Sequence, residues 1–192
     1  MHKVLNGMKS GIVVVNGTAY YYEEAGAAGH PVVLLHSGLA NCRMWDREFA
    51  TFAEHFRVIR YDLPGFGRSA TPSGEFSTRA DLAGLLRALG VQRAHVVGLS
   101  LGGSLGIDFA IEYPDTVSAL VAVAPGLGGS EPDPATVKMF EELQAAEADQ
   151  IARDVPGARK VVFPKVAHLV NLEQPELFSQ TVLEFLQSVV VG

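Results

Sequence analysis

The chain has 192 residues, a hydrophobic share of 48% and a formal net charge of −6. That length suits one domain with a sizeable core and is too short for two ordinary ones, so we expect a single domain over residues 1–192. An acidic balance without a basic cluster argues against nucleic acid and anionic membranes as partners.

The first part of the chain predicts an antiparallel hairpin. Residues 1–7 hold no apolar run long enough for a signal peptide or a membrane span, which makes the cytoplasm the expected location. The β-rich runs 12–15 and 18–23 flank Asn16-Gly17, the dipeptide most typical of a tight two-residue hairpin turn.

Strands and helices alternate along the rest of the chain. Apolar runs predict strands over residues 31–35, 56–61, 94–97, 117–123 and 160–164. Helical spacing of apolar side chains predicts helices over residues 42–55, 77–89 and 101–113, one ending near 154, and a last one beginning near 173. This alternation predicts an α/β three-layer sandwich, with helices on both faces of a mostly parallel twisted sheet that starts with the hairpin. A single helical crossover separates the last two predicted strands, so we expect them to be parallel neighbours.

A glycine-rich turn after the strand at 94–97 carries the strongest chemical signal. Ser100 stands within Gly98-x-Ser-x-Gly102, the pattern of a nucleophile elbow. A serine on so tight a turn has strained backbone angles, and neighbours without side chains allow the close approach. The turn places the hydroxyl at a helix N-terminus, where the amide of Leu101 can bind a developing oxyanion. A purely structural glycine-rich turn is the alternative interpretation.

Four segments carry a resemblance to a known family. They are Leu34–Gly38, Tyr61–Ser69, Val97–Gly103 and Val166–Glu176. In this order they resemble the α/β-hydrolase superfamily, specifically its small esterase, lactonase and C–C hydrolase branch. The resemblance implies that Ser100 is the nucleophile and His168 the general base. It also implies an oxyanion hole formed by the backbone amides of Leu101 and of Gly38 or Leu39.

The chemistry of the residues supports His168 independently. A serine hydroxyl needs a base to take its proton as it attacks, and imidazole titrates near neutrality. Of the six histidines, His36 stands at the correct sheet edge, but the resemblance gives its loop the oxyanion role. His168 follows the predicted strand 160–164, at the carboxyl edge where sites in open α/β sheets form. A structural histidine is the alternative interpretation.

The stretch between residues 123 and 160 is shorter than the resemblance implies. Family members carry there a helical lid, another strand and the acid of the catalytic triad. This chain has only a loop rich in proline and glycine and one helical segment. Glu147 interrupts the apolar stripe of that segment, as a junction near residues 145–149 would. We therefore interpret the chain as a truncated α/β-hydrolase core that lacks the lid and the acid-bearing strand.

The carboxylate that orients the imidazole must then come from elsewhere. Asp133, in the loop after the strand at 117–123, is the predicted acid, because some family branches place theirs at this edge. Glu131 in the same loop and Glu173 near the last helix are the alternatives. Asp62 stands at the correct edge, but its loop motif favours a local cap or salt bridge.

Two functions from different classes remain open. The first is a serine hydrolase that cleaves small carboxylic esters, lactones or thioesters through an acyl-enzyme. Its activity is expected to be weak, because loss of the orienting acid typically lowers turnover on the order of 10⁴-fold. The second is a catalytically impaired core that binds a small apolar ligand or a protein partner.

The expected site is an open apolar groove beside an accessible Ser100. Its predicted substrate-binding residues are Trp45 and Leu127, near Leu39. An open apolar face or an unpaired sheet edge favours self-association into a homo-oligomer. No metal or cofactor is expected, because the one cysteine lacks ligand spacing.

Overall fold

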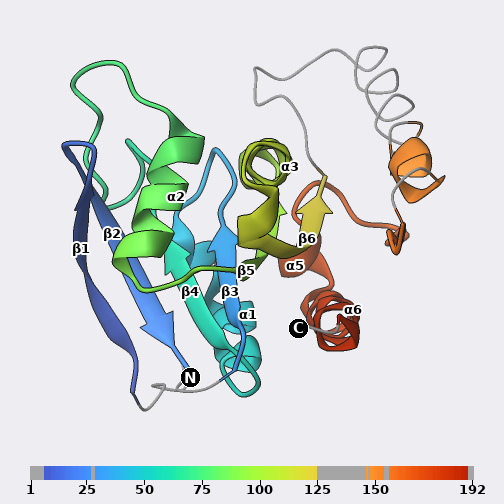
Figure 1. Ribbon diagram of the computed structural model, residues 1–192. Coiled ribbons are helices and arrows are strands. Elements are labelled where there is room, and N and C mark those ends of the chain that lie inside the picture. The colour runs from blue at the N-terminus through green and yellow to red at the C-terminus, as the bar shows by residue number, and fades with distance from the viewer. Residues whose placement is uncertain (1–6, 27–28, 125–145, 147, 154–155, 190–192) are drawn as a thin grey trace.

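The protein forms a layered α/β structure around a six-stranded sheet (Figure 1). The computed structural model describes residues 7–26, 29–124, 146, 148–153 and 156–189. The strands are β1 (Lys9–Val15), β2 (Thr18–Ala25), β3 (Pro31–Leu35), β4 (Arg57–Tyr61), β5 (Ala94–Leu99) and β6 (Val117–Val123). Their order across the sheet is β1-β2-β4-β3-β5-β6. β2 pairs antiparallel with β1 and β4, and the other neighbours are parallel, which confirms the predicted fold class.

The hairpin between β1 and β2 forms at the predicted dipeptide. Asn16 and Gly17 both adopt positive φ angles, 48° and 82°, as the common two-residue hairpin turn requires. Asparagine and glycine tolerate this left-handed backbone better than other residues. The turn sets the register in which Val15 pairs with Thr18.

Helices cover both faces of the sheet. They are the 3-10 turns η1 (Cys42–Trp45) and η2 (Pro114–Thr116), and the helices α1 (Asp46–Phe52), α2 (Thr78–Ala88), α3 (Leu101–Glu112), α5 (Val170–Glu173) and α6 (Pro175–Ser188). One core cluster joins α2 and α3 to the sheet, and a second joins α1 and α6 to the opposite face (Figure 1). Within the described ranges, no helix combines the length and apolar character needed to cross a bilayer.

Side-chain caps set the starts of two helical elements. Ser77 is the predicted N-cap of α2, and its hydroxyl accepts a hydrogen bond from the amide of Ala80 at 3.3 Å. The helix predicted over residues 42–55 instead begins as the 3-10 turn η1. The Asn41 side chain caps that turn by accepting from the amide of Arg43 at 2.9 Å. The α-helical part therefore starts four residues later than predicted, at Asp46.

The prediction of a strand over residues 160–164 is wrong. The segment is irregular, and β6 is the outermost strand at this side of the sheet among the described residues. Val161 and Val162 are exposed, and Lys165 has a left-handed φ of 58° that no strand accommodates. The Gln174 side chain donates to the carbonyl of Pro164 at 2.9 Å, so this segment bonds to the start of α6 instead of β6.

Candidate active site

Ser100 occupies a strained turn between β5 and α3. Its φ and ψ angles are 55° and −116°, a conformation that a residue with a side chain adopts only at a cost of about 1–3 kcal/mol. Two backbone hydrogen bonds hold it there. The Ser100 amide donates to the carbonyl of Val123 on β6 at 2.9 Å, and its carbonyl accepts from the amide of Ser104 at 2.9 Å.

The glycines around Ser100 are required by close packing. A Cβ at Gly98 would collide with the backbone carbonyl of Gly102, and a Cβ at Gly102 would collide with the carbonyls of Leu35 and His36. The first turn of α3 therefore packs directly on β5 and on the end of β3. This contact fixes the direction in which the α3 N-terminus points.

The loop after β3 lies against the start of α3. An ideal Cβ on Gly38 would stand 3.5 Å from the Leu101 side chain, so these two predicted oxyanion-hole residues are neighbours. Ser37 begins the loop, and its amide donates to the Met44 sulfur at 3.3 Å. The loop thus bridges the elbow and η1.

His36 is a structural histidine that secures this loop. The amide of Leu63 donates to its Nε2 at 2.8 Å, so its Nδ1 carries the hydrogen and donates to the carbonyl of Ser37 at 2.7 Å. The side chain is fully buried, and burial lowers the pKa of its imidazole. Both ring nitrogens are occupied, which leaves His36 without a free nitrogen for acid–base chemistry.

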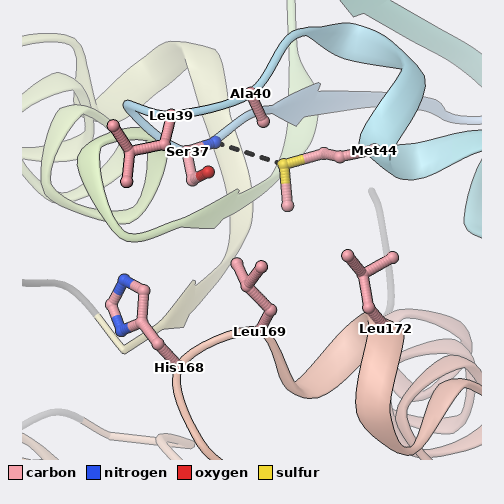
Figure 2. A pocket seen from close by; sticks show the side chains of 7 residues that line it. All are labelled: Ser37, Leu39, Ala40, Met44, His168, Leu169 and Leu172. Atoms are coloured by element: carbon pink, nitrogen blue, oxygen red, sulfur yellow. Dashed lines mark hydrogen bonds between the residues drawn. The ribbon is translucent and has the colours of Figure 1, made fainter.

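A cavity of about 270 Å³ opens between this loop and the segment that carries His168 (Figure 2). Its lining is mostly apolar and consists of Ser37, Leu39, Ala40, Met44, His168, Leu169 and Leu172. Figure 2 shows the His168 ring extending from the α5 side toward Leu39 on the opposite wall. The predicted base and the predicted oxyanion loop therefore face one another across one small cavity.

Side-chain hydrogen bonds hold the His168 segment. The Glu173 carboxylate accepts from the amide of Ala167 at 2.8 Å, one residue before His168. On the inner side, the Asn171 amide group donates to the carbonyl of Met44 at 3.2 Å. Among the residues that the structure describes, no carboxylate forms a hydrogen bond or an ion pair with His168.

The carboxylates of Asp62 and Glu173 both accept hydrogen bonds from backbone amides. The two Asp62 oxygens accept from the amides of Cys42 and Arg68, each at 2.8 Å, which matches the local role favoured by its loop motif. Glu173 likewise accepts from a backbone amide. Burial and the neighbouring Asp62 raise the pKa of the Cys42 thiol well above its usual range.

Asp133, the predicted acid, lies outside the described residues, as do Glu131, Leu127 and residues 145 and 147 of the predicted junction.

The structure corrects the prediction of Trp45 as a substrate-binding residue. Its side chain is fully buried and stacks on Phe178 of α6, with ring centroids 6.1 Å apart. Successive residues in a 3-10 turn point about 120° apart, so Trp45 faces the core while Met44 faces the cavity. Ser100 is only 7% exposed, so the site is more enclosed than the predicted open groove.

Sequence reasoning also missed five residues of the cavity wall. They are Ser37, Ala40, Met44, Leu169 and Leu172. For the four other than Met44, a position close to Gly38 or His168 was the available signal, because residues that flank a site often line it. Nothing in their spacing indicates that the two segments face each other, since this depends on where α5 and α6 pack.

Comparisons with known proteins identify the family. Residues 30–146 match the family model of the alpha/beta hydrolase fold. The chain is 35% identical over 148 residues to a 2-hydroxy-6-oxo-6-phenylhexa-2,4-dienoate hydrolase of Comamonas testosteroni, covering 70% of this chain and 51% of that protein. It is 37% identical over 133 residues to RutD of Caulobacter segnis, a protein named as a carbamate hydrolase, covering 66% of this chain and 49% of that protein.

The fold agrees with a solved structure. The enol-lactonase of Burkholderia xenovorans LB400 aligns with a TM-score of 0.76 at 23% identity, covering 93% of this chain and 100% of that chain. The chain spans about half the length of the two sequence relatives. With the family model matching residues 30–146, the chain belongs to the α/β-hydrolase fold family.

Proposed function

We propose that this protein is a serine hydrolase that cleaves small carboxylic esters, lactones or thioesters through an acyl-enzyme. The observation that carries the proposal is the left-handed backbone of Ser100 at the start of α3, with the Gly38 loop against the same helix end. Strain of this kind persists where the surrounding structure enforces it, and it is concentrated at functional sites.

The proposed mechanism begins with His168 taking the proton of the Ser100 hydroxyl as its oxygen attacks the substrate carbonyl. The amides of Leu101 and of Gly38 or Leu39 stabilise the negative oxygen of the tetrahedral intermediate. His168 then donates the proton to the leaving group, and the acyl group remains on Ser100. A water molecule activated by His168 releases the acid and restores the serine.

The cavity supports a small substrate with an apolar acyl part. A volume of about 270 Å³ lies at the lower end of the usual range for ligand pockets, and its walls are mostly aliphatic. The two sequence relatives are named as hydrolases of a carbamate and of an oxo-dienoate, which are small carbonyl-containing molecules. We assign this chain the same broad class of substrate, with no nucleic acid, membrane, metal or cofactor involved, in the cytoplasm.

Activity is expected to be weak unless Asp133 serves as the orienting acid. Without a carboxylate partner, the imidazole of His168 is free to adopt the wrong tautomer, and its protonated form loses a stabilising neighbour. The substrates that suffer least are activated esters, because a good leaving group needs little general-acid assistance. We also propose self-association through the cavity face or along β6, the outermost strand at its side of the sheet among the described residues.

Labelling with a fluorophosphonate probe tests the proposed function. The wild-type protein should become covalently labelled and should slowly hydrolyse a short-chain nitrophenyl ester, whereas Ser100→Ala should do neither. A matched control is Ser104→Ala, which changes a hydroxyl one helical turn away and should label normally. Absence of labelling in folded wild-type protein would reject the serine mechanism and favour a ligand-binding or partner-binding core.

A further inference from the structure

A buried carboxyl group stands four residues after Met44 of the cavity wall, outside the residues of the proposed mechanism. Glu48 of α1 has no exposed surface, although its side chain is ionisable. The Ser179 hydroxyl of α6 donates to Glu48 Oε1 at 3.0 Å. Burial raises the pKa of Glu48, and hydrogen bonds from its own backbone, Ser179 and Asn171 only partly oppose this rise.

Two oxygen atoms in this region have no hydrogen-bond partner. They are Oε2 of Glu48 and Oδ1 of Asn171, and both are fully buried. An ionised Glu48 would leave two buried acceptors without a donor, which typically costs about 1–3 kcal/mol for each group. The two side chains interact, so a proton on Glu48 Oε2 would supply the donor that this pair of oxygens lacks.

Asn171 connects this buried group to the cavity. It is 1% exposed and belongs to α5, three residues after His168. Its Nδ2 donates to the carbonyl of Met44, a residue of the cavity wall. A change at Glu48 therefore reaches both the His168 segment and the opposite wall through a single amide side chain.

We propose that Glu48 and Asn171 are positioning residues, a neutral carboxyl–amide pair that holds the His168 segment at its distance from the Met44 wall. The proposal rests on the proposed role of His168 as the general base. It requires Glu48 to keep its proton at neutral pH, so that the two unpartnered oxygens share one hydrogen. Glu48 itself touches no reacting atom and acts only through Asn171.

The charged surroundings of Glu48 favour this neutral form. Arg47, on the same helix, is the charged side chain that interacts with Glu48, but it is half exposed and pairs with Glu176 of α6. From α5 and α6, Glu48 is approached by the Asn171 amide and the Ser179 hydroxyl, neither of which carries a charge. A strongly screened surface arginine stabilises a buried carboxylate only weakly.

The test compares Glu48→Gln with Glu48→Ala in the full chain. The first readout is amide hydrogen exchange of residues 166–172, with residues 94–99 of β5 as an internal reference. The second is kcat and KM for a short-chain nitrophenyl ester, measured across pH. Gln180→Ala, an exposed change on α6 at a residue that bonds to Glu184, is the matched surface control.

We expect Glu48→Gln to behave like the wild type, because its amide nitrogen donates without carrying a charge and its carbonyl oxygen still accepts from Ser179. Glu48→Ala should raise exchange in residues 166–172 about tenfold, as expected for the loss of one buried hydrogen bond. It should lower kcat by about the same factor and leave KM within about twofold. The wild type should lose activity as rising pH ionises Glu48, because burial raises the pKa of this carboxyl, and Glu48→Gln should lack this loss.

Three results would overturn the proposal. One is Glu48→Gln impaired as strongly as Glu48→Ala, since this would mean that the negative charge is required. Another is exchange rising equally in β5, which would make Glu48 a general structural residue. If Glu48→Ala does not fold, Asn171→Ala takes its place, and unchanged exchange in residues 166–172 would then reject the pair. A wild type without hydrolysis or labelling would reject the proposed function, while the exchange comparison would still decide the positioning role.

Discussion

Ser100 is held by backbone packing, whereas His168 stands on a segment held by a few side chains. The elbow is enclosed by β5, β3 and α3, and two of its glycines admit no side chain without a collision. The His168 segment is irregular and largely exposed. It depends on hydrogen bonds that the side chains of Asn171 and Gln174 donate and that the Glu173 carboxylate accepts. The nucleophile is therefore placed by the fold itself. The base is placed by contacts that single substitutions can remove.

The largest loss of stability should come from a substitution at the Ser100 elbow, which is held by backbone packing. Gly102→Val adds a side chain that collides with the carbonyls of Leu35 and His36. Such overpacking against backbone cannot relax, so the free energy of unfolding should fall by more than about 4 kcal/mol. Urea denaturation measures the effect. Gly74→Ala is the matched control, because a Cβ there meets no atom within 4 Å. Equal stability of both variants would show that the elbow tolerates movement.

The amino end of β5 should make the same region sensitive to acid. His95 is fully buried, its Nδ1 lies 3.1 Å from the Ser118 hydroxyl, and its Nε2 has no partner. Burial, together with the nearby His30 and Arg93, lowers the pKa of His95 to about 4. The unfolded chain, with an ordinary pKa near 6.5, therefore binds more protons between pH 6.5 and pH 4. This contribution to stability is complete above pH 6.5 and falls by at most about 3 kcal/mol as the pH drops to 4.

The measurement is the free energy of unfolding of the wild type and of His95→Leu over this pH range. The wild type should lose more stability than the variant as the pH falls, and the difference between the two curves isolates the imidazole. Parallel curves would mean that His95 takes up its proton in the folded protein without penalty. The amino end of β5 would then contribute no pH dependence to the free energy of unfolding.

The smallest effect on stability should come from the exposed hydrogen bond between Glu173 and the Ala167 amide, next to His168. Glu173→Ala removes the acceptor for the amide of Ala167, and an exposed hydrogen bond contributes less than about 1 kcal/mol to stability. Glu173→Gln keeps a carbonyl oxygen that accepts the same bond, so its ester hydrolysis should stay within about twofold of the wild type. A loss of roughly a hundredfold in the glutamine variant would instead identify Glu173 as the acid that serves His168.

The sequence predicted well those parts that local chemistry determines. The hairpin turn at Asn16-Gly17, the cap at Ser77 and the bounds of β3 and β6 depend on residues adjacent in the chain, and the structure confirms them. Likewise, the strained turn at Ser100 follows from glycines two residues away on either side. In each case the residue type limits the backbone angles or supplies the hydrogen bond directly.

The failures occurred where placement depends on distant packing. The run 160–164 has an apolar composition typical of a strand, yet the carbonyl of Pro164 accepts from Gln174 at the start of α6. Trp45 suits an apolar groove by residue type, but its position in the 3-10 turn directs its side chain onto Phe178. The contact between Glu48 and Ser179 joins residues 131 positions apart and leaves no periodic signal in the sequence. Such contacts are determined only when the helices have packed.

The burial of Cys42 makes the native protein almost unreactive toward thiol reagents. Its side chain is 1% exposed, and the raised pKa of the thiol keeps the reactive thiolate scarce. A cysteine introduced at the exposed Leu39 would therefore be modified selectively, with no need to remove the native one. A fluorophore or spin label attached there would report from the rim of the cavity as a ligand enters or as a second copy of the chain approaches.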